Sequence, residues 1–168
     1  RTESRRDQLT RLGNRREADL RWPELIAQAR RTGAPLAVAL ADLDHFKRVN
    51  DRHGHAAGDQ VLVALAGLLQ ANTRSADLVA RIGGEEFVLV LPDAPLARAW
   101  DVCERLRQSV EHYAWSELSP GLEVTLSIGL ASAPPYSTDL HLPAGPLFEH
   151  ITGQGPIPNG GDHVFCQH

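Results

Sequence analysis

Two glycines and two carboxylates stand side by side in the segment 81–87, which reads Arg-Ile-Gly-Gly-Glu-Glu-Phe. Apolar residues flank it, at 78–80 before and at 87–91 after. Two β-rich runs joined by a glycine pair predict a β-hairpin, because glycine accepts the positive φ of tight hairpin turns. Glu85 and Glu86 would then lie at the hairpin tip, where their mutual repulsion favours a bound cation, most simply a divalent metal.

A second source of carboxylates follows the apolar run 36–41, which is typical of a buried strand. Asp42 and Asp44 stand at the carboxyl end of this run. Asp42 and Glu85 would meet at one edge of a sheet if their strands are neighbours, and a metal ion would fit between them. Taken alone, Asp42 suits a strand-end turn better than a metal site. The glycine hairpin makes the metal site the stronger hypothesis.

The elements around these carboxylates follow from hydrophobic period and from glycine and proline positions. The predicted order is helix, strand, helix, hairpin, helix, strand, which is an α/β domain with a mostly antiparallel central sheet flanked by helices. A lead-in helix at 1–13 precedes a turn, and Pro23 is expected at the start of the next helix. Later helices are expected near 61–69 and 96–115, and the last strand at 121–131.

Composition limits the class of protein. The chain has 168 residues, of which 42% are hydrophobic, so it can bury one core. No apolar run approaches the roughly 20 residues that span a bilayer, which predicts a cytoplasmic domain with no membrane segment of its own. The net charge of −4 argues against a nucleic-acid-binding protein. Cys103 and Cys166 have no metal-ligand spacing.

Residues 134–168 differ in character from the rest of the chain. They are rich in proline, glycine and histidine without a period, and no lysine or arginine follows Arg107. Such a composition is typical of loop or disorder. We therefore divide the chain into a domain at 1–139 and an atypical tail at 140–168, which we interpret as a non-native ending of the kind that a shifted reading frame produces.

Three motifs, taken in order, resemble one known family. They are Asp7–Arg16, Asp42–Asp51 and Gly83–Phe87. Together they resemble the GGDEF domain of the diguanylate cyclases, in its GGEEF variant, over residues 7–131. The resemblance implies a nucleotidyl-cyclase-like fold with the signature on the hairpin. Arg11 stands where the family usually has glycine, and we expect this difference to matter little.

By this resemblance, the domain joins two GTP molecules into cyclic di-GMP and releases pyrophosphate. The family's metal ligands match Asp42, Glu85 and the carbonyl of Leu43, around two Mg²⁺ or Mn²⁺ ions per active site. Glu86 matches a residue that assists deprotonation of the attacking hydroxyl, although orienting the metal or the substrate is an equally physical role. Because one site holds one GTP, catalysis would require a homodimer.

The resemblance also assigns substrate-binding residues: Phe46, Lys47, Asn50, Asp59, Gly83 and Gly84. The two glycines would let the backbone approach the phosphates, since any Cβ there would intrude. A carboxylate at Asp59 and an amide at Asn50 suit the donors and acceptors of guanine. Both residue types are also common helix caps, which leaves a purely structural alternative for these two.

A second site is implied by Arg74 and Asp77, which match the family's product-inhibition motif, with Arg105 placed on the next helix to join them. Guanidinium groups suit guanine edges, phosphates and base stacking. The alternative is a surface ion pair between Arg74 and Asp77 that contributes about a few tenths of a kcal/mol. In the functional interpretation, cyclic di-GMP is both product and inhibitor.

The tail departs from the family, which normally ends with a basic helix that contacts the triphosphate and with a final strand. This departure supports a competing hypothesis, a catalytically impaired module that only binds cyclic di-GMP. A structural dimerisation domain that binds neither nucleotide is a third possibility. The chain contains no methionine, so we expect it to come from a longer bacterial protein, membrane-linked or not, whose upstream sensory or regulatory domain is missing.

Overall fold

The computed structural model describes residues 4–133 and 162–166. Its elements, in chain order, are β1 Gly13–Asn14, α1 Arg15–Thr32, β2 Leu36–Leu43, α2 Phe46–His53, α3 His55–Ala71, β3 Leu78–Arg81, β4 Glu86–Pro92, α4 Leu96–Glu111, the short 3-10 helix η1 Trp115–Glu117, β5 Leu126–Ala133 and β6 Asp162–Cys166. No helix in this part of the chain is both long and apolar enough to cross a bilayer.

The strands form one six-stranded sheet in the order β1-β3-β4-β2-β5-β6. Only the short β1–β3 pair is parallel, and the four other pairs are antiparallel. The prediction of a mostly antiparallel α/β sheet is therefore confirmed. The run at 36–41 becomes β2, which is hydrogen-bonded to β4 on one side and to β5 on the other.

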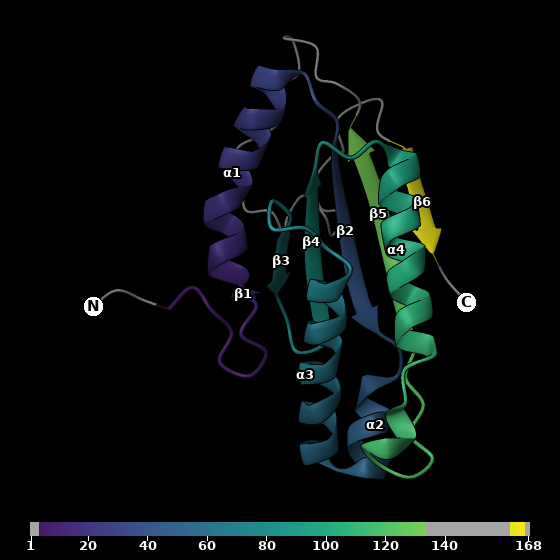
Figure 1. The fold of residues 1–168 in the computed structure, drawn as a ribbon. Coiled ribbons are helices and arrows are strands. Elements are labelled where there is room, and N and C mark those ends of the chain that lie inside the picture. The colour runs from purple at the N-terminus through teal and green to yellow at the C-terminus, as the bar shows by residue number, and fades with distance from the viewer. Residues whose placement is uncertain (1–3, 134–161, 167–168) are drawn as a thin grey trace.

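Alternate residues of the strands enter two separate hydrophobic clusters, as the period of two in a strand requires. Residues such as Ala39 and Leu89 pack with α3 and α4, whereas Val88 and Val90 pack with Trp22 of α1. Figure 1 shows this arrangement as three layers, with α1 on one face of the sheet and α3 and α4 on the other. α2 extends past the end of the sheet, next to the carboxyl end of β2.

The predicted lead-in helix at 1–13 is wrong for its described part, which contains a turn and an isolated bridge between Arg6 and Gly13. The reason is local. The carboxylate of Asp7 accepts hydrogen bonds from the Thr10 amide at 2.8 Å and from its hydroxyl at 2.7 Å, which closes a turn in place of a helix. Arg11 then adopts a φ of 64°, in the left-handed region.

The helix predicted to begin at Pro23 is α1, and it begins earlier than predicted. Asn14 has an extended backbone, and its side chain accepts a hydrogen bond from the Glu17 amide at 3.0 Å, so it caps α1 at Arg15. Pro23 lies inside the helix and not at its start. A strong cap therefore decides where the helix begins, and the proline is accommodated within it.

The prediction of loop or disorder for the tail is wrong at its end, because Asp162–Cys166 forms β6 and pairs antiparallel with β5. Backbone pairing with an available strand edge does not require the hydrophobic alternation on which strand prediction depends. The remaining residues of the predicted tail lie outside the described part of the chain, as does the boundary predicted at 139.

Candidate active site

The signature segment forms the predicted hairpin. β3 and β4 pair antiparallel, with Arg81 opposite Phe87, and the residues between them form the turn. Phe87 is fully buried on the α3 and α4 side of the sheet, whereas Glu85 and Glu86 are half-buried at the turn. The aromatic residue therefore anchors the hairpin in the core, and the two carboxylates remain near solvent.

The two glycines do not have the conformation that the hairpin prediction assumed. Neither Gly83 nor Gly84 has a positive φ. The two glycines differ in the space available for a side chain. A Cβ on Gly83 would lie 2.9 Å from Glu86 Oε2, whereas a Cβ on Gly84 would meet nothing within 4 Å. Gly84 is also exposed, so folding of this domain does not require glycine there, and its small size matters only to a molecule that approaches from outside.

Arg81 holds the signature turn in place. Its Nε donates to the carbonyls of Gly83 and Gly84, both at 3.2 Å, and its Nη2 donates to Gly84 O at 2.8 Å. Its Nη1 pairs with the carboxylate of Asp7 at 3.2 Å. Burial raises the pKa of Asp7, but hydrogen bonds from Thr10 and Arg81 outweigh burial and hold that pKa below its usual value. Sequence reasoning missed Arg81, although it opens the signature segment.

Asp42 stands in β2 directly opposite Glu86 of β4. Opposite residues in an antiparallel pair have their side chains on the same face of the sheet. The backbone of the next residue reaches the turn itself, since the Leu43 amide donates to Glu85 O at 3.3 Å. The structure therefore brings Asp42, Glu85 and Glu86 together at one edge of the sheet, which we call the carboxylate edge. The strands that carry Asp42 and the signature are neighbours, as predicted.

The electrostatics of this edge are unfavourable without a cation. Partial desolvation, followed by the charges of Glu85, Glu86 and Asp44, raises the pKa of Asp42 from 3.8 to about 6. Asp42 lies on the solvent-exposed edge, where an ion can reach it. The cost of placing these carboxylates together would be relieved by a divalent cation with oxygen ligands.

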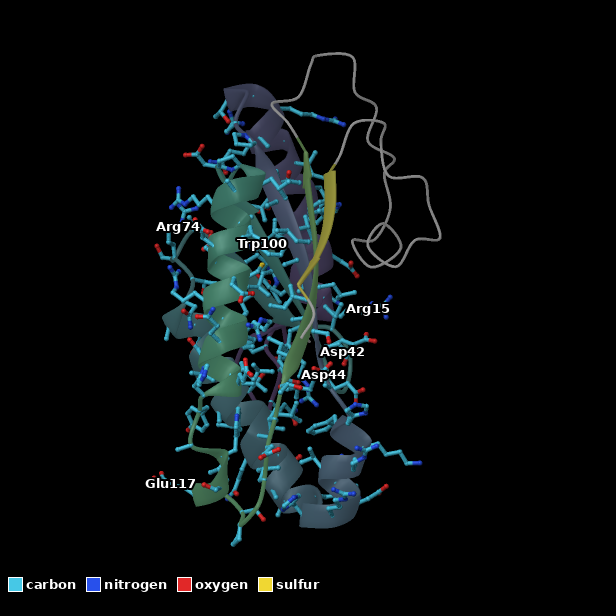
Figure 2. The ribbon with its side chains drawn as sticks, turned by 90° about the vertical axis from the view of Figure 1, so that its right-hand side faces the viewer. Arg15, Asp42, Asp44, Arg74, Trp100 and Glu117 are labelled. Carbon is cyan, nitrogen blue, oxygen red and sulfur yellow. The ribbon has the colours of Figure 1, made fainter. Side chains whose placement is uncertain are left out.

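Asp44 has a different role from Asp42. Its two carboxylate oxygens accept hydrogen bonds from the hydroxyls of Thr125, at 2.7 Å, and Ser127. Its amide donates to Thr125 O at 3.0 Å. Figure 2 shows Asp42 and Asp44 next to each other on one side of the sheet. Because hydroxyl groups of Thr125 and Ser127 occupy the oxygens of Asp44, this residue fixes the turn after β2. Asp42 and the glutamates remain for an external ligand.

Oxygen atoms at this edge could hold a hard divalent metal. Asp42, Glu85 and the carbonyl of Leu43 would supply them, and Mg²⁺ and Mn²⁺ prefer oxygen ligands. Within residues 4–133 and 162–166, no group of three or more His, Cys, Asp or Glu side chains is arranged to hold a metal. The protein therefore supplies an incomplete ligand set, which suits a metal that also binds substrate phosphates.

Four of the six residues matched to substrate binding lie on α2 and at the start of α3, and the other two are the glycines of the signature turn. Phe46 has its ring in the core and is 8% exposed, so only its backbone, at the first residue of α2, can face a ligand. Lys47 is exposed beside it. Neither Asn50 nor Asp59 caps a helix N-terminus, since His45 and Gly54 occupy the N-cap positions of α2 and α3. The capping alternative for Asn50 and Asp59 is therefore wrong.

The three residues matched to product inhibition gather around one pocket of about 260 Å³, whose lining includes Arg74, Asp77 and Arg105. The surface ion pair weighed as an alternative is present, because Arg74 Nη2 lies 3.4 Å from Asp77 Oδ1. Arg98, which sequence reasoning missed, also lines the pocket. Figure 2 places Arg74 on the opposite side of the molecule from Asp42, so the pocket and the carboxylate edge are separate sites.

The family described as "Diguanylate cyclase, GGDEF domain" matches residues 4–142. Diguanylate cyclase DgcP from Pseudomonas aeruginosa is 41% identical over 126 residues, which cover 75% of this chain and 19% of that protein. Response regulator PleD from Caulobacter vibrioides is 42% identical over 129 residues, which cover 75% of this chain and 28% of PleD. The chain thus spans less than a third of the length of these relatives.

Solved structures agree with this assignment. The GGDEF domain of DgcB from Caulobacter crescentus, in complex with c-di-GMP, superposes with a TM-score of 0.73 at 31% identity, covering 80% of this chain and 81% of that one. The active GGEEF domain of a diguanylate cyclase from Vibrio cholerae superposes with a TM-score of 0.69 at 31% identity, covering 76% and 79%. Motifs, fold and relatives agree, and the chain belongs to the diguanylate cyclase GGDEF domain family.

Proposed function

We propose that this domain condenses two GTP molecules into cyclic di-GMP with release of two pyrophosphates. The observation that carries the proposal is the meeting of Asp42, Glu85 and Glu86 at one edge of the sheet, where partial desolvation and then the neighbouring carboxylates raise the pKa of Asp42. Named diguanylate cyclases among the relatives support it. The exposed position of Gly84, with open space around its Cα, leaves room for a nucleotide at the same turn.

In this reaction, each 3′-hydroxyl attacks the α-phosphorus of the other GTP, so that two new P–O bonds form and two bonds to pyrophosphate break. Asp42, Glu85 and the carbonyl of Leu43 would hold two Mg²⁺ or Mn²⁺ ions. When bound, such ions neutralise phosphate charge and lower the pKa of a coordinated hydroxyl. Glu86, half-buried at the start of β4, would accept the 3′-hydroxyl proton or orient the nucleotide.

Residues of α2 and α3 would bind the base and the phosphates. Asn50 and Asp59 would read guanine, since a carboxylate accepts from its N1 and N2 donors and adenine lacks that pair. Lys47 and the first backbone amides of α2 would bind the phosphates, because amides at a helix start have no partner within the helix. The Phe46 contribution is limited to its backbone. One domain presents one such site, so the product requires a homodimer with two facing sites.

The direct test is to incubate the purified chain with GTP and Mg²⁺ and to separate the nucleotides by chromatography. Cyclic di-GMP should accumulate, and Asp42→Ala should abolish it. Asp51→Ala removes another exposed carboxylate, on α2, and should retain activity. A folded wild-type domain that binds GTP but yields no cyclic di-GMP in either Mg²⁺ or Mn²⁺ overturns the catalytic proposal.

A second candidate function is cyclic di-GMP binding without turnover, which the pocket at Arg74, Asp77 and Arg105 favours. In an active enzyme the same site would give product inhibition. Arg98 adds a further guanidinium to this pocket. Calorimetric titration with cyclic di-GMP tests whether the domain binds this nucleotide. Binding that is lost in Arg74→Ala but kept in Asp42→Ala, together with absence of turnover, supports the binding module over the enzyme.

The relatives also suggest a regulatory setting. SiaD from Pseudomonas aeruginosa, 41% identical to this chain, was solved in complex with its activator SiaC. We propose that this domain belongs to a longer bacterial protein whose sensory or regulatory part precedes it and controls the pairing of two domains. Fusion of the domain to a dimerising segment at its N-terminus should raise turnover per domain, and an unchanged rate contradicts control by pairing.

A further inference from the structure

Gly58 of α3 lies against the side chain of Asn50 of α2. A Cβ on Gly58 would overlap Asn50 Oδ1, and it would lie 3.0 Å from Asn50 Cγ and 3.4 Å from Phe46 Cζ. The backbone of Gly58 is helical and its φ is not positive, so the position does not require glycine for its conformation. Because glycine inside a helix costs stability relative to alanine, its presence here is explained by the space that Asn50 occupies.

Buried side chains and backbone hydrogen bonds hold α2 against α3. Phe46 and Val49 anchor α2 in the core and are 8% and 7% exposed. The Gly54 amide donates to Asn50 O at 2.9 Å, and the Gly58 amide donates to Gly54 O at 3.1 Å. The two helices lie side by side at one end of the molecule (Figure 1). A methyl group at Gly58 would therefore displace the Asn50 side chain.

Packing, not hydrogen bonding, holds that side chain. Asn50 is half-buried, and its amide makes no hydrogen bond to any of the residues that the structure describes. A half-buried amide that keeps its donors and acceptor free is available to a ligand. Contact with Gly58 limits its rotation, so less conformational entropy is lost when the ligand binds.

We propose that Gly58 is a positioning residue for base recognition. It fixes the side-chain amide of Asn50 against α3. Asn50 and Asp59, which follows Gly58 in the chain, then bind the same purine. This inference rests on the proposed function, in which these two residues read guanine. It predicts that Gly58 affects nucleotide affinity and not the chemical step, because the reacting phosphates lie at the carboxylate edge and not at the base.

Steady-state pyrophosphate release tests the inference with a matched pair of variants. Gly58→Ala should raise KM for GTP about tenfold, the equivalent of one lost hydrogen bond, and should change kcat less than about threefold. The control is Gly67→Ala on the same helix, where an added Cβ meets nothing within 4 Å. It should leave both constants unchanged. Equal effects of the two variants on KM overturn the inference.

A double-mutant cycle separates positioning from a general effect on α3. Asn50→Ala removes the atoms that a Cβ on Gly58 would overlap. Gly58→Ala in that background should have no further effect on KM, and it should raise Tm as Gly67→Ala does. If Gly58→Ala raises KM by the same factor in both backgrounds, it does not act through Asn50, and the inference is wrong.

Equilibrium GTP binding distinguishes failure of this inference from failure of the proposed function. A wild-type domain that neither turns over nor binds GTP overturns both. A wild-type domain that binds GTP, with unchanged affinity in Gly58→Ala, overturns the positioning role of Gly58 alone. Weaker GTP binding in Gly58→Ala than in Gly67→Ala supports it, even where turnover is too slow to measure.

Discussion

Arg81 and Asp7, which are 74 positions apart in the chain, form a two-point ion pair in which Arg81 Nη1 lies 3.2 Å from Asp7 Oδ2 and 3.3 Å from Oδ1. The same guanidinium donates to the carbonyls of Gly83 and Gly84. One side chain therefore connects the segment before α1 to the turn that presents Glu85. A displacement of that segment would be transmitted to the turn through this contact.

Arg81→Lys should lower turnover at least about tenfold and cost only about 1 kcal/mol of stability. Lysine keeps the charge but cannot donate to Asp7 and to two carbonyls at once. Pyrophosphate release and thermal melting measure the two effects. Arg107→Lys is the control, because Arg107 pairs only with Glu104 and Glu111 on α4 among the partners found in the described residues. Equal turnover in both variants would argue against a role for Arg81.

The raised pKa of Asp42 predicts a pH dependence of stability in the absence of metal. With a pKa of about 6 in the folded state and 3.8 as its ordinary value, the folded protein binds more protons than the unfolded chain between those values. Stability therefore falls as pH rises through this window, and the loss is complete above about pH 6. Asp42→Asn should raise Tm at pH 7.5 in EDTA and leave it unchanged at pH 3.5. A gain of equal size at both values contradicts this origin.

Gly84→Ala should separate folding from ligand binding. An added Cβ meets nothing within 4 Å and the φ of Gly84 is not positive, so Tm should stay within about 1 °C of the wild type. GTP affinity should fall several-fold if the nucleotide approaches this backbone. Titration of GTP into the two proteins gives the answer, and unchanged affinity would place the phosphates elsewhere.

Arg11→Gly should stabilise the domain by about 1 kcal/mol, because Arg11 has a φ of 64°, a conformation that costs a residue with a Cβ about that much. This outcome would contradict the expectation that Arg11 in place of the family's glycine matters little. Arg21→Gly, inside α1, should lower stability by about the same amount. Urea unfolding of both variants tests the contrast, and a loss of stability in Arg11→Gly would contradict it.

The sequence predicted those parts of the site that depend on local pattern. The buried run before Asp42 and the hairpin that carries Glu85 are both read from neighbouring residues, and the structure has both. The fold class was predicted correctly because the order of helices and strands is also read from local pattern. The start of α1 failed because the cap at Asn14 decided it, against the signal from Pro23.

The contacts that sequence reasoning missed depend on how separate elements pack together. Nothing near Asp44 indicates that the hydroxyls of Thr125, just before β5, and Ser127, in β5, will occupy its carboxylate. Nothing near Gly58 indicates that Asn50 will lie on it, because that depends on how α2 turns back onto α3. Strand β6 was missed because pairing with β5 is a backbone property. Such features become visible only when the chain is folded.

Strand β2 has partners on both sides, with Asp42 aligned to Glu86 on β4 and to Ser127 on β5. A slip of one residue would turn Asp42 into the core and expose Leu43, and it would have to break both ladders at once. The spacing of the carboxylates is thus independent of the surface loops. A single deletion within β2 should therefore abolish the site, because β2 does not tolerate a change in length.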